Sequence, residues 1–451
     1  MNPSNPNLIF VFADQLRLQA LGYAGDPNVH TPNLDWLASH SVNFTHAISG
    51  CPVCSPARAS LLTGQYPDRH GVFVNDVNLN PKANTLQKAF KEAGYTTAYI
   101  GKWHLDGHGR TAYIPPERRP YFDYWKALEC THDYNHSYYY EGSDPTRRLW
   151  DGYDVIAQTR DAQRYIENQA GKGPFFLVLS WGTPHNPYET APERFRRMYD
   201  PQKIHLRPNV PPEAQAQARV DLAGYYAHIS ALDEMIGELL GTIRKTGIEE
   251  NTLFVFWSDH GDMLGSQGQQ RKQRPWEESI RVPLLLRYPA CFGGEGKTVD
   301  CLINTPDIPP TLLTLCHLPV PSGMDGLDYA PYLLGYINTP PAEEAMIACY
   351  HPFGEFNAYQ HGGVEYRGLR TRRYTYARTL QGAWLLYDNE TDPYQMKNLI
   401  GDPAYANIQQ ELEERLRRKL AEIGDEFLPG LEYVRRRGYP LDETGTVPIL
   451  P

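Results

Sequence analysis

The chain has 451 residues, enough to bury a large core, and we expect one large domain and a smaller one. Hydrophobic residues make up 41% of the chain and charged residues 21%, which is typical of a folded globular protein and excludes a disordered one. A net charge of −10, with no run rich in Lys or Arg, argues against nucleic acid as the main partner.

No stretch of the chain is apolar over the roughly 18 residues that a membrane-spanning helix needs. The first strand-like run, Leu8 to Phe12, is not preceded by a charged segment and an apolar stretch. We therefore expect either a cytoplasmic protein or an export signal outside the given chain. The seven cysteines have neither metal-ligand spacing nor the density of a disulfide scaffold, which weakly favours a reducing compartment.

Apolar runs alternate with helical patterns from the N-terminus onward. The apolar runs indicate strands buried on both faces of a sheet, and they cover residues 8–13, 97–101, 175–181, 252–257 and 282–287. Helices are expected over residues 85–93, 155–169 and about 214–245. This alternation predicts an α/β fold in which helices sandwich a large, mixed but mainly parallel sheet.

The C-terminal part of the chain has a different pattern. Residues 319–341 are rich in Pro and Gly, and we place a domain boundary inside this stretch. After it, short segments indicate an antiparallel sheet, and residues 404–423 indicate an amphipathic helix. We therefore predict a large α/β domain over residues 1–330 and a small α+β subdomain over residues 331–451, with a packing helix.

Ionisable or metal-binding side chains follow four of the expected strands. A lone Asp or His after a strand usually makes local hydrogen bonds. In sheets of this kind, however, ligands bind at the carboxyl ends of the strands, so four occupied strand ends predict one polar site. The side chains are Asp14 and Gln15, then Lys102 and His104, then His185, and finally Asp259 and His260.

Four of these residues suit a divalent metal ion: Asp14, Gln15, Asp259 and His260. Carboxylate and amide oxygens are ligands for a hard cation such as Ca²⁺ or Mg²⁺. The imidazole of His260 shifts the preference somewhat toward Mn²⁺. We expect a metal site at this edge of the sheet.

A nucleophilic side chain, Cys54, lies at the mouth of a short expected helix. Ser55 suits the N-cap of this helix, Pro56 its first turn and Gly64 its C-terminal end. The helix start and the permanent charge of Arg58 would both stabilise an anion near Cys54. The pattern predicts a site for an anionic substrate.

Cys51 and Cys54 also form a Cys-x-x-Cys pair at a helix start, an arrangement that lowers the pKa of a thiol in redox proteins. Taken alone, this pair would favour a thiol–disulfide function. The long motif that continues beyond Cys54 favours another interpretation, in which Cys51 is a buried small residue.

The run from Cys54 to Gly64 resembles the activation motif of the type I sulfatases, Cys-x-Pro-x-Arg followed by Leu-Thr-Gly. These formylglycine-dependent enzymes belong to the alkaline phosphatase superfamily, so the resemblance implies an alkaline-phosphatase-like fold. It also implies that a formylglycine-generating enzyme oxidises Cys54 and that the hydrated aldehyde, a geminal diol, is the nucleophile. The diol would attack the sulfur of a sulfate ester, expel the alcohol and release sulfate as the aldehyde re-forms.

Two further segments resemble motifs of the same family. The sequence Gly-Lys-Trp-His at residues 101–104 implies that Lys102 binds the sulfate and that His104 is a general base toward the formylglycine diol. The segment around His185 resembles one whose histidine contacts the ester near the leaving oxygen. His185 would then be a general acid, which has to be protonated near neutral pH, and a neighbouring sulfate dianion or carboxylate would raise its pKa.

A third matching segment contains Lys272, followed by the pair Glu277 and Glu278 and by Arg281 in an Arg-Val-Pro sequence. The resemblance implies that Lys272 binds the sulfate and the leaving oxygen, where charge develops in the transition state. The two glutamates and Arg281 are expected to be structural.

The resemblance assigns a metal to Asp14, Gln15, Cys54, Asp259 and His260, with Ca²⁺ as the expected ion and Mn²⁺ or Mg²⁺ as alternatives. Many sulfatases have a second Asp in place of Gln15 and often Asn in place of His260. The residues of this chain are similar to those of choline sulfatases and phosphonate monoester hydrolases. A phosphonate monoester or phosphodiester hydrolase is therefore an alternative function, although the Lys-Trp-His sequence counts against it.

The expected substrate is a small-molecule or oligosaccharide sulfate ester, with a carbohydrate sulfate mildly preferred to an aryl sulfate. Residues 106–153, which are rich in aromatic and polar side chains, are expected to wall the site, and residues 351–356 to form a second wall. A hypothesis from another class is a non-catalytic protein that binds anions or sugars and never gains formylglycine.

Overall fold

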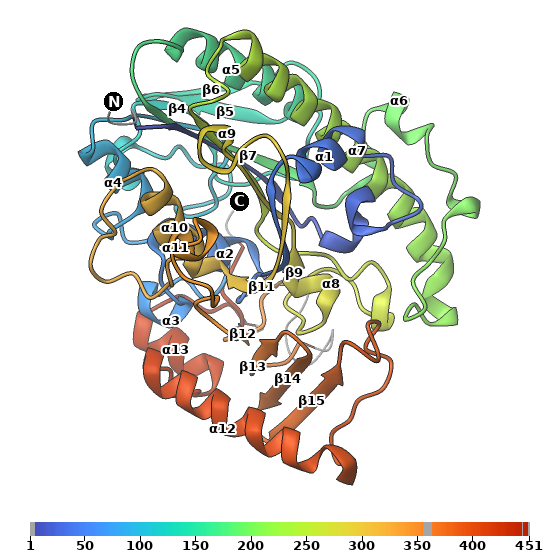
Figure 1. Ribbon diagram of the computed structural model, residues 1–451. Coiled ribbons are helices and arrows are strands. Elements are labelled where there is room, and N and C mark those ends of the chain that lie inside the picture. Colours follow the sequence, from blue (N-terminus) through green and yellow to red (C-terminus); the bar gives the residue numbers. More distant parts are fainter. Residues whose placement is uncertain (1–4, 355–362, 444, 450–451) are drawn as a thin grey trace.

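The computed structural model describes residues 5–354, 363–443 and 445–449, and its centre is an 11-stranded sheet (Figure 1). Its middle strands are parallel and lie in the order β8, β1, β7 and β3. All four were expected from apolar runs, and the predicted mixed, mainly parallel sheet is confirmed. Their bounds are Thr252–Ser258 for β8, Asn7–Asp14 for β1, Phe175–Pro184 for β7 and Thr96–Lys102 for β3.

Both faces of β1 are buried, because alternate side chains of a strand point to opposite faces of the sheet. Leu8, Phe10 and Phe12 belong to one buried cluster, whereas Ile9 and Val11 belong to another. Burial of side chains of this size is worth about 1.5–3 kcal/mol each. The two cores explain why β1 is a continuous apolar run rather than an alternating one.

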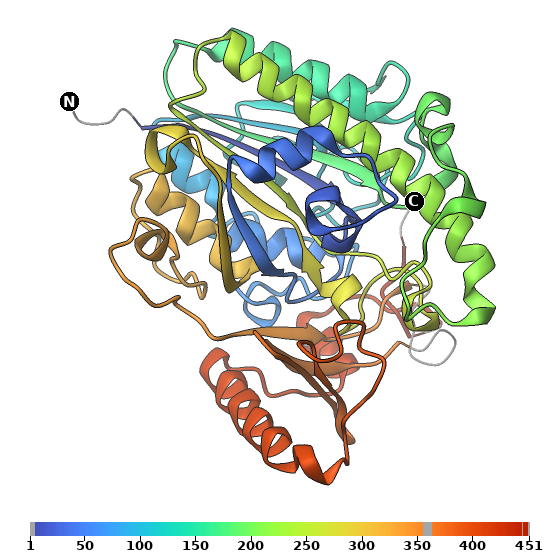
Figure 2. The ribbon, with the colours of Figure 1, turned by 45° about the vertical axis from the view of Figure 1, so that its right-hand side comes forward.

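Helices cover both faces of the sheet, as predicted (Figures 1 and 2). On one face lie α1 (Pro32–Ser39), α5 (Asp154–Gln169) and α7 (Gln215–Lys245). On the other lie α2 (Cys54–Thr63), α4 (Leu86–Glu92) and α10 (Ile308–Leu315). Shorter helices are α3 (Pro67–His70), α6 (Glu193–Arg196), α8 (Glu277–Ile280), α9 (Pro289–Phe292) and α11 (Ala330–Leu333).

One edge of the sheet differs from the prediction. The strand expected over residues 282–287 is divided at Pro283, which has no N–H to donate, into β9 (Arg281–Val282) and β10 (Leu284–Arg287). β10 is antiparallel to β8 and to β2 (Val42–Ile48), and β2 is parallel to β11 (Lys297–Asn304). β2 and β11 were not expected, because both contain polar residues that interrupt any apolar run.

The insert expected over residues 106–153 extends the sheet at its opposite edge. β4 (Tyr124–Leu128) is parallel to β3, and β5 (Tyr138–Glu141) and β6 (Asp144–Leu149) continue the sheet in antiparallel fashion. Because β4 is parallel to β3, the residues that follow Leu128 emerge at the same edge as those that follow Lys102. The insert therefore reaches the edge of the sheet where the polar residues were expected.

A second, four-stranded antiparallel sheet lies at the C-terminal end of the chain (Figures 1 and 2). Its strands are β12 (Glu344–Cys349), β13 (Tyr366–Thr371), β14 (Tyr374–Thr379) and β15 (Gly382–Asp388). The predicted packing helix is α12 (Ala406–Ile423), and α13 (Gly430–Arg437) follows it. Leu412 and Leu416 of α12 belong to the same buried cluster as Phe10 of β1, so the boundary at residue 330 stays a prediction.

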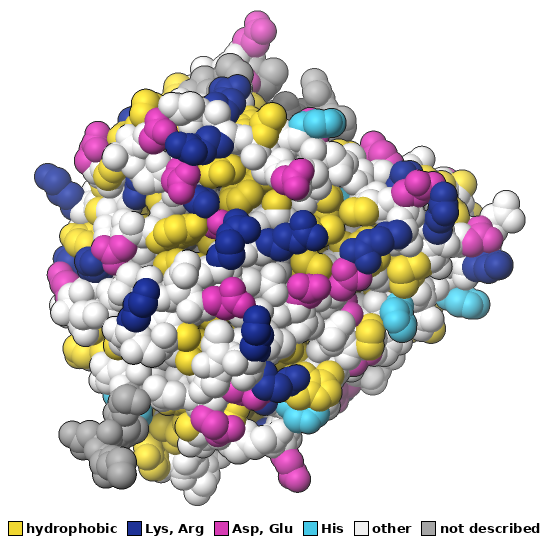
Figure 3. All heavy atoms as spheres, turned by 90° about the horizontal axis from the view of Figure 1, so that it is seen from above, with side chains coloured by type: hydrophobic (Ala, Val, Ile, Leu, Met, Phe, Trp, Pro, Cys, Tyr) yellow, Lys and Arg dark blue, Asp and Glu magenta, His cyan; other side chains and the backbone are white. Residues whose placement is uncertain are grey.

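The surface carries both signs of charge. On the face shown in Figure 3, Lys and Arg side chains are interspersed with Asp and Glu side chains. Positive charge on this face is therefore balanced locally. Among the described residues, every helix is too short or too polar to cross a lipid bilayer.

Candidate active site

Side chains from distant segments converge at the carboxyl edge of the parallel strands and line a cavity of about 290 Å³. Lys102 is the last residue of β3, and His185 directly follows β7. The structure thus brings together the residues that were expected to be catalytic. Cys54, Lys102, His104, His185 and Lys272 line the cavity, and Arg58 is buried beside them.

Helix α2 presents Cys54 as its first residue, but its N-cap is Val53, so the prediction that Ser55 caps the helix is wrong. Ser55 lies inside the first turn, and its hydroxyl donates to the backbone oxygen of His104 at 2.7 Å. This bond ties α2 to the loop after β3. Gly64 ends the helix in the left-handed conformation, with φ of 64°, as predicted.

The thiol of Cys54 is surrounded by basic groups. Its Sγ lies 3.6 Å from Lys272 Nζ, 4.0 Å from Lys102 Nζ and 3.2 Å from His260 Nε2. Burial and the Asp14 carboxylate raise the pKa of the thiol, but Lys102, Lys272 and His260 outweigh them. The pKa of Cys54 therefore lies well below its usual range, and the same charges would stabilise another anion at this position.

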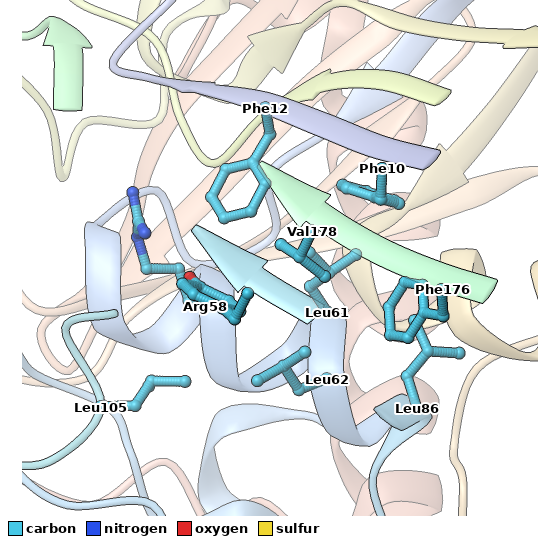
Figure 4. Close-up of a pocket in the computed structure, with 10 residues that line it drawn as sticks. Phe10, Phe12, Arg58, Leu61, Leu62, Leu86, Leu105, Phe176 and Val178 are labelled. Atoms are coloured by element: carbon cyan, nitrogen blue, oxygen red, sulfur yellow. The ribbon is translucent and has the colours of Figure 1, made fainter. Parts of the chain in front are cut away.

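Arg58 holds two carboxylates in place. Its Nη2 donates to Asp14 Oδ2 and its Nε to Asp259 Oδ2, both at 3.0 Å. Apolar side chains beside Arg58 line a void of about 10 Å³, and Figure 4 shows its guanidinium pointing away from Leu61, Leu62 and Leu105. The guanidinium carbon lies 4.8 Å from the ring centroid of Phe12. Arg58 thus fixes the two carboxylates at the border between the site and the apolar core.

Asp14, Cys54, Asp259 and His260 form a group that could hold a metal ion, since one ligand atom of each lies within 4.8 Å of the others. His260 Nδ1 lies 3.0 Å from the Gly261 carbonyl oxygen, and donation to it leaves Nε2 facing the group. Burial and the neighbouring Asp14 raise the pKa of Asp259, because two buried carboxylates repel each other. A divalent cation would relieve this repulsion, so the donor set fits one.

Gln15 lies beside this group, but its side-chain amide has other partners. Its Oε1 accepts a hydrogen bond from Lys272 Nζ at 2.8 Å, and its Nε2 donates to Asp262 Oδ2 at 2.6 Å. Asp262, which was not predicted, also accepts from the Tyr188 hydroxyl at 2.5 Å. The backbone of Gln15 has φ of 72°, a strained conformation for a residue with a side chain. In this structure Gln15 positions Lys272, and its predicted role as a metal ligand stays a prediction.

His104 is held by a carboxylate that no sequence pattern marks. Its Nε2 lies 3.2 Å from Asp76 Oδ1, and Asp76 also accepts two hydrogen bonds from Arg110, at 3.0 and 2.8 Å. Burial lowers the pKa of His104, but the Cys130 thiolate and Asp76 raise it to about 9. Asp76 lies in a loop far from any strand end, so only the folded chain reveals it.

His185 is neutral in the structure, which contains no sulfate. Lys272 Nζ lies 2.5 Å from its Nε2, and its Nδ1 lies 2.8 Å from the Asn186 carbonyl oxygen. Because an ammonium group only donates, Nε2 is the acceptor and Nδ1 carries the proton. Burial and Lys272 lower the pKa of His185 well below its usual range, and the opposing effect of Asp14 is smaller. His185 is therefore neutral in the protein without substrate, and its protonation beside a bound sulfate stays a prediction.

Cys51 does not share the environment of Cys54. It is 5% exposed, and burial raises the pKa of its thiol well above the usual range. All seven cysteines are free, so Cys51 and Cys54 form no disulfide. The prediction that Cys51 is a buried small residue is confirmed.

The insert contributes two cavity-lining residues, Arg110 and His132, as expected of a wall. The ring of His132 stacks on that of His185, with centroids 4.6 Å apart and planes 7° apart. The stacking fixes the orientation of the His185 imidazole. Residues 106–153 therefore shape the site as well as enclosing it.

Of the second expected wall, residues 351–356, Phe353 and Gly354 line the cavity. His351 does not, and its Nε2 instead lies 3.1 Å from the Gly445 carbonyl oxygen. Residues 355 and 356 lie outside the described residues. Among the described residues of this segment, Phe353 and Gly354 form the wall.

Glu277, Glu278 and Arg281 make ion pairs that join parts of the fold. Glu277 Oε1 lies 2.7 Å from Arg370 Nε of β13, and Glu277 Oε2 lies 3.2 Å from Arg281 Nη1. Glu278 accepts from Arg207 at 2.9 Å. These contacts agree with the structural role expected for the three residues.

Comparison with known proteins gives concordant findings. A family model described as Sulfatase matches residues 6–318, and one described as N-sulphoglucosamine sulphohydrolase, C-terminal, matches residues 265–422. The Ulvan-active sulfatase of Formosa agariphila is 48% identical over 97% of this chain and 85% of its own length.

Two solved structures are similar over nearly the whole chain. One, from work on the metabolism of glycosaminoglycans by Bacteroides thetaiotaomicron, has a TM-score of 0.85 and 30% identity, and covers 94% of this chain and 97% of its own. Another was solved in complex with its substrate D-glucosamine-2-N,6-O-disulfate. It has a TM-score of 0.80 and 25% identity, and covers 95% of this chain and 99% of its own.

Proposed function

Because the chain belongs to the formylglycine-dependent sulfatase family and is a sulfuric ester hydrolase, we propose that it removes sulfate from a sulfated carbohydrate, with Cys54 as the precursor of its formylglycine. One observation carries the assignment of Cys54. Lys102, Lys272 and His260 surround its Sγ, the atom that formylglycine replaces with oxygen. An anion bound there meets the positive charges of Lys102 and Lys272, which are already in position.

The two lysines are assigned to the sulfate group. Lys102 Nζ donates to Asp14 Oδ2 at 2.6 Å, which fixes the ammonium group beside residue 54. Among the described residues, Lys272 has no carboxylate partner, and it donates to the amide of Gln15 and to neutral His185. The ammonium group of Lys272 is therefore assigned to bind the sulfate and the leaving oxygen.

The two histidines are assigned to proton transfer. Replacing the Cys54 thiolate by an uncharged diol removes one of the interactions that raise the pKa of His104, which favours its role as a base. A bound sulfate would raise the pKa of His185 and draw Lys272 away from its Nε2. His185 Nε2 would then be free to carry a proton to the leaving alcohol.

Asp14, Asp259 and His260 are assigned to a divalent metal, with Ca²⁺ as the ion because carboxylate oxygens dominate the set, and with Mn²⁺ or Mg²⁺ as alternatives. When bound, the ion supplies positive charge to the sulfate oxygens. Arg58 keeps both carboxylates in place whether or not the ion is present, since it pairs with each of them.

The lining of the cavity supports a carbohydrate over an aryl alcohol. Asn75, Asn186, Arg110 and His132 are among the residues that line it, and polar groups of these kinds pair with hydroxyls. The similar proteins named above act on ulvan or on a sulfated glucosamine, which supports the same class. Ulvan fragments are therefore the first substrates to test.

The test combines mass spectrometry with turnover. The protein is produced together with a formylglycine-generating enzyme, and fragment ions of the tryptic peptide that ends at Arg58 locate the modification at residue 54 or 51. We expect formylglycine at residue 54 alone and release of sulfate from ulvan fragments. The Cys51→Ala variant should keep both, because Cys51 is buried away from the cavity, and Cys54→Ala should lose both.

Two outcomes would contradict the proposal. An unmodified Cys54 in protein from its native host would favour a protein that binds anions without catalysis. Faster turnover of a phosphate diester than of the matched sulfate ester would favour the phosphodiester alternative. A simple aryl sulfate serves as the reference substrate, since a carbohydrate sulfatase should turn it over more slowly.

A further inference from the structure

Glu129, a buried carboxylate that has no part in the roles assigned above, contacts the loop that carries His104. It directly follows β4 and is 1% exposed. Its Oε1 accepts the backbone N–H groups of Asp106 and Gly107, at 2.8 and 3.0 Å, and its Oε2 accepts that of Leu105, at 3.2 Å. One side chain thus binds the three residues that directly follow His104.

The environment of Glu129 makes its charge costly. Among the described residues, its hydrogen bonds all come from backbone N–H groups, and it forms no ion pair. Burial raises its pKa to about 7, and the neighbouring His104 acts against this rise. A buried carboxylate without a cationic partner stabilises a fold less than an apolar side chain would. Its presence beside the cavity therefore indicates a role in the site.

His104 has a backbone conformation that needs support. Its φ of 58° lies in the left-handed region, which a residue with a side chain rarely adopts and keeps only where surrounding contacts impose it. On the preceding side, the Trp103 N–H donates to the Leu128 carbonyl oxygen at 2.8 Å. The Ser55 hydroxyl donates to the carbonyl oxygen of His104 at 2.7 Å. The three bonds to Glu129 supply the support on the following side.

The backbone conformation of His104 decides where its imidazole points. Its Nε2 lies 3.2 Å from Asp76 Oδ1, and its Nδ1 has no hydrogen-bond partner among the described residues. Because His104 and Cys54 line the same cavity, Nδ1 is the nitrogen left for residue 54. Asp76 thus holds the ring, and Glu129 holds the backbone that carries it.

We propose that Glu129 is a positioning residue for His104: its carboxylate fixes the loop after His104 and thereby keeps the imidazole at residue 54. The inference rests on the proposed function, in which His104 is the base toward the formylglycine diol. Glu129 itself does not line the cavity, so it acts through His104. Its loss should therefore lower kcat and leave KM nearly unchanged.

The test is a double-mutant cycle on the full chain carrying formylglycine, with sulfate release measured at about pH 8, above the pKa of Glu129. Glu129→Gln should lower kcat about tenfold, because the NH₂ group of the new amide faces a backbone N–H whichever way the amide is turned. In a His104→Ala background the same change should alter kcat by less than about twofold, because the group that Glu129 positions is gone. Glu117→Gln, at an exposed glutamate of the same insert, is the matched control and should change kcat in neither background.

Equal losses of kcat from Glu129→Gln in the two backgrounds would overturn the inference, since the effect would then not pass through His104. A change in KM as large as the change in kcat would overturn it as well, because it would mean that the whole site is distorted.

Hydrogen exchange decides the inference where turnover cannot be measured. The exchange of a peptide that contains residues 103–108 is followed by mass spectrometry on the unmodified full chain. It should be faster in Glu129→Gln and unchanged in Glu117→Gln, because the three amides after His104 lose their acceptor only in the first variant. Unchanged exchange in Glu129→Gln overturns the inference. If the modified, unsubstituted protein releases no sulfate from any ester, the proposed function fails, and the exchange result still decides the role of Glu129.

Discussion

The active-site centre and the C-terminal sheet both bury cations, but they neutralise them differently. In the C-terminal sheet, Arg367 Nε lies 2.5 Å from Asp425 Oδ2, and both side chains are fully buried. Arg370 likewise pairs with Glu277 at 2.7 Å. In the centre, Lys272 is buried with no carboxylate partner among the described residues, and its contacts are an amide, a neutral imidazole and the Cys54 sulfur.

This difference distinguishes a buried charge that is part of the fold from one that is available to a ligand. A buried ion costs several kcal/mol of desolvation, which a paired carboxylate offsets. Arg367 has such a partner, so its charge is compensated inside the fold without a ligand. Lys272 has no carboxylate partner among the described residues, and modification replaces the Cys54 sulfur beside it with an uncharged diol. In the formylglycine form, the anion that neutralises Lys272 is therefore expected from outside, which is the property of a binding site.

The largest expected effect comes from removing the unpaired cation. Lys272→Ala should lower kcat/KM for a sulfate ester by about 10³-fold, because the charge acts on oxygens that become negative in the transition state. The melting temperature should change little, since no ion pair is broken. Steady-state kinetics and thermal unfolding of the same preparation check both parts.

Lys203→Ala is the matched control, because that lysine is 84% exposed and carries an exposed ion pair. It should alter neither activity nor unfolding. If Lys272→Ala instead lost stability in proportion to activity, the contrast between the two regions would fail and Lys272 would be structural.

Removal of the paired cation, Arg367, is expected to lower stability and to leave activity unchanged. Arg367→Ala leaves Asp425 buried without its partner and removes a guanidinium carbon that lies 3.6 Å from the ring centroid of Tyr350. Unfolding free energy should fall by about 3 kcal/mol or more. The kcat/KM of the protein that remains folded should stay unchanged, because no atom of Arg367 lines the cavity.

Urea unfolding monitored by fluorescence measures this loss. Arg436→Ala serves as the control, since Arg436 is 48% exposed and pairs with Glu426 at the surface, where such pairs contribute about 1 kcal/mol or less. Similar losses for the two variants would show that burial of the Arg367 pair adds nothing to its stabilising effect.

The contrast also shows why the sequence predicts some elements and misses others. β1 is apolar at every position because it contributes to two cores, so it is visible without any partner. β2 and β11 keep polar residues on partly exposed positions, so their assignment depends on neighbours that are distant in the chain. Strand existence is thus predictable where burial is complete on both faces.

The candidate site shows the same division. Strand ends predict where Lys102, His185 and Asp259 lie, because parallel strands bring their carboxyl ends to one edge. They do not predict Asp76, which lies in a loop, or the neutral state of His185. That state depends on Lys272, which lies 87 residues further along the chain and only 2.5 Å away in space. Charge states follow from tertiary neighbours, which a motif does not specify.

His228 lies outside the active-site centre and the C-terminal sheet and gives a third case. It is a buried basic side chain that stays uncharged instead of pairing with a carboxylate. His228 of α7 is fully buried, its Nδ1 lies 2.6 Å from the Tyr153 hydroxyl, and its Nε2 lies 3.3 Å from the Pro187 carbonyl oxygen. Burial lowers its pKa from 6.5 to about 4. The rings of Tyr153 and Tyr134 that contact it have raised pKa values and stay neutral at acidic pH.

The sign of the pH effect follows from these values. Below pH 6.5 the unfolded chain protonates His228, whereas the folded protein does so only near pH 4. The unfolded state binds more protons in this window, so stability is lost as pH falls, by about 1.4 kcal/mol per pH unit and about 3 kcal/mol in total. His228→Gln removes this contribution, and urea unfolding at several pH values between 7 and 4 should show a shallower loss of stability. Parallel curves for the two proteins would mean that His228 is already charged when folded.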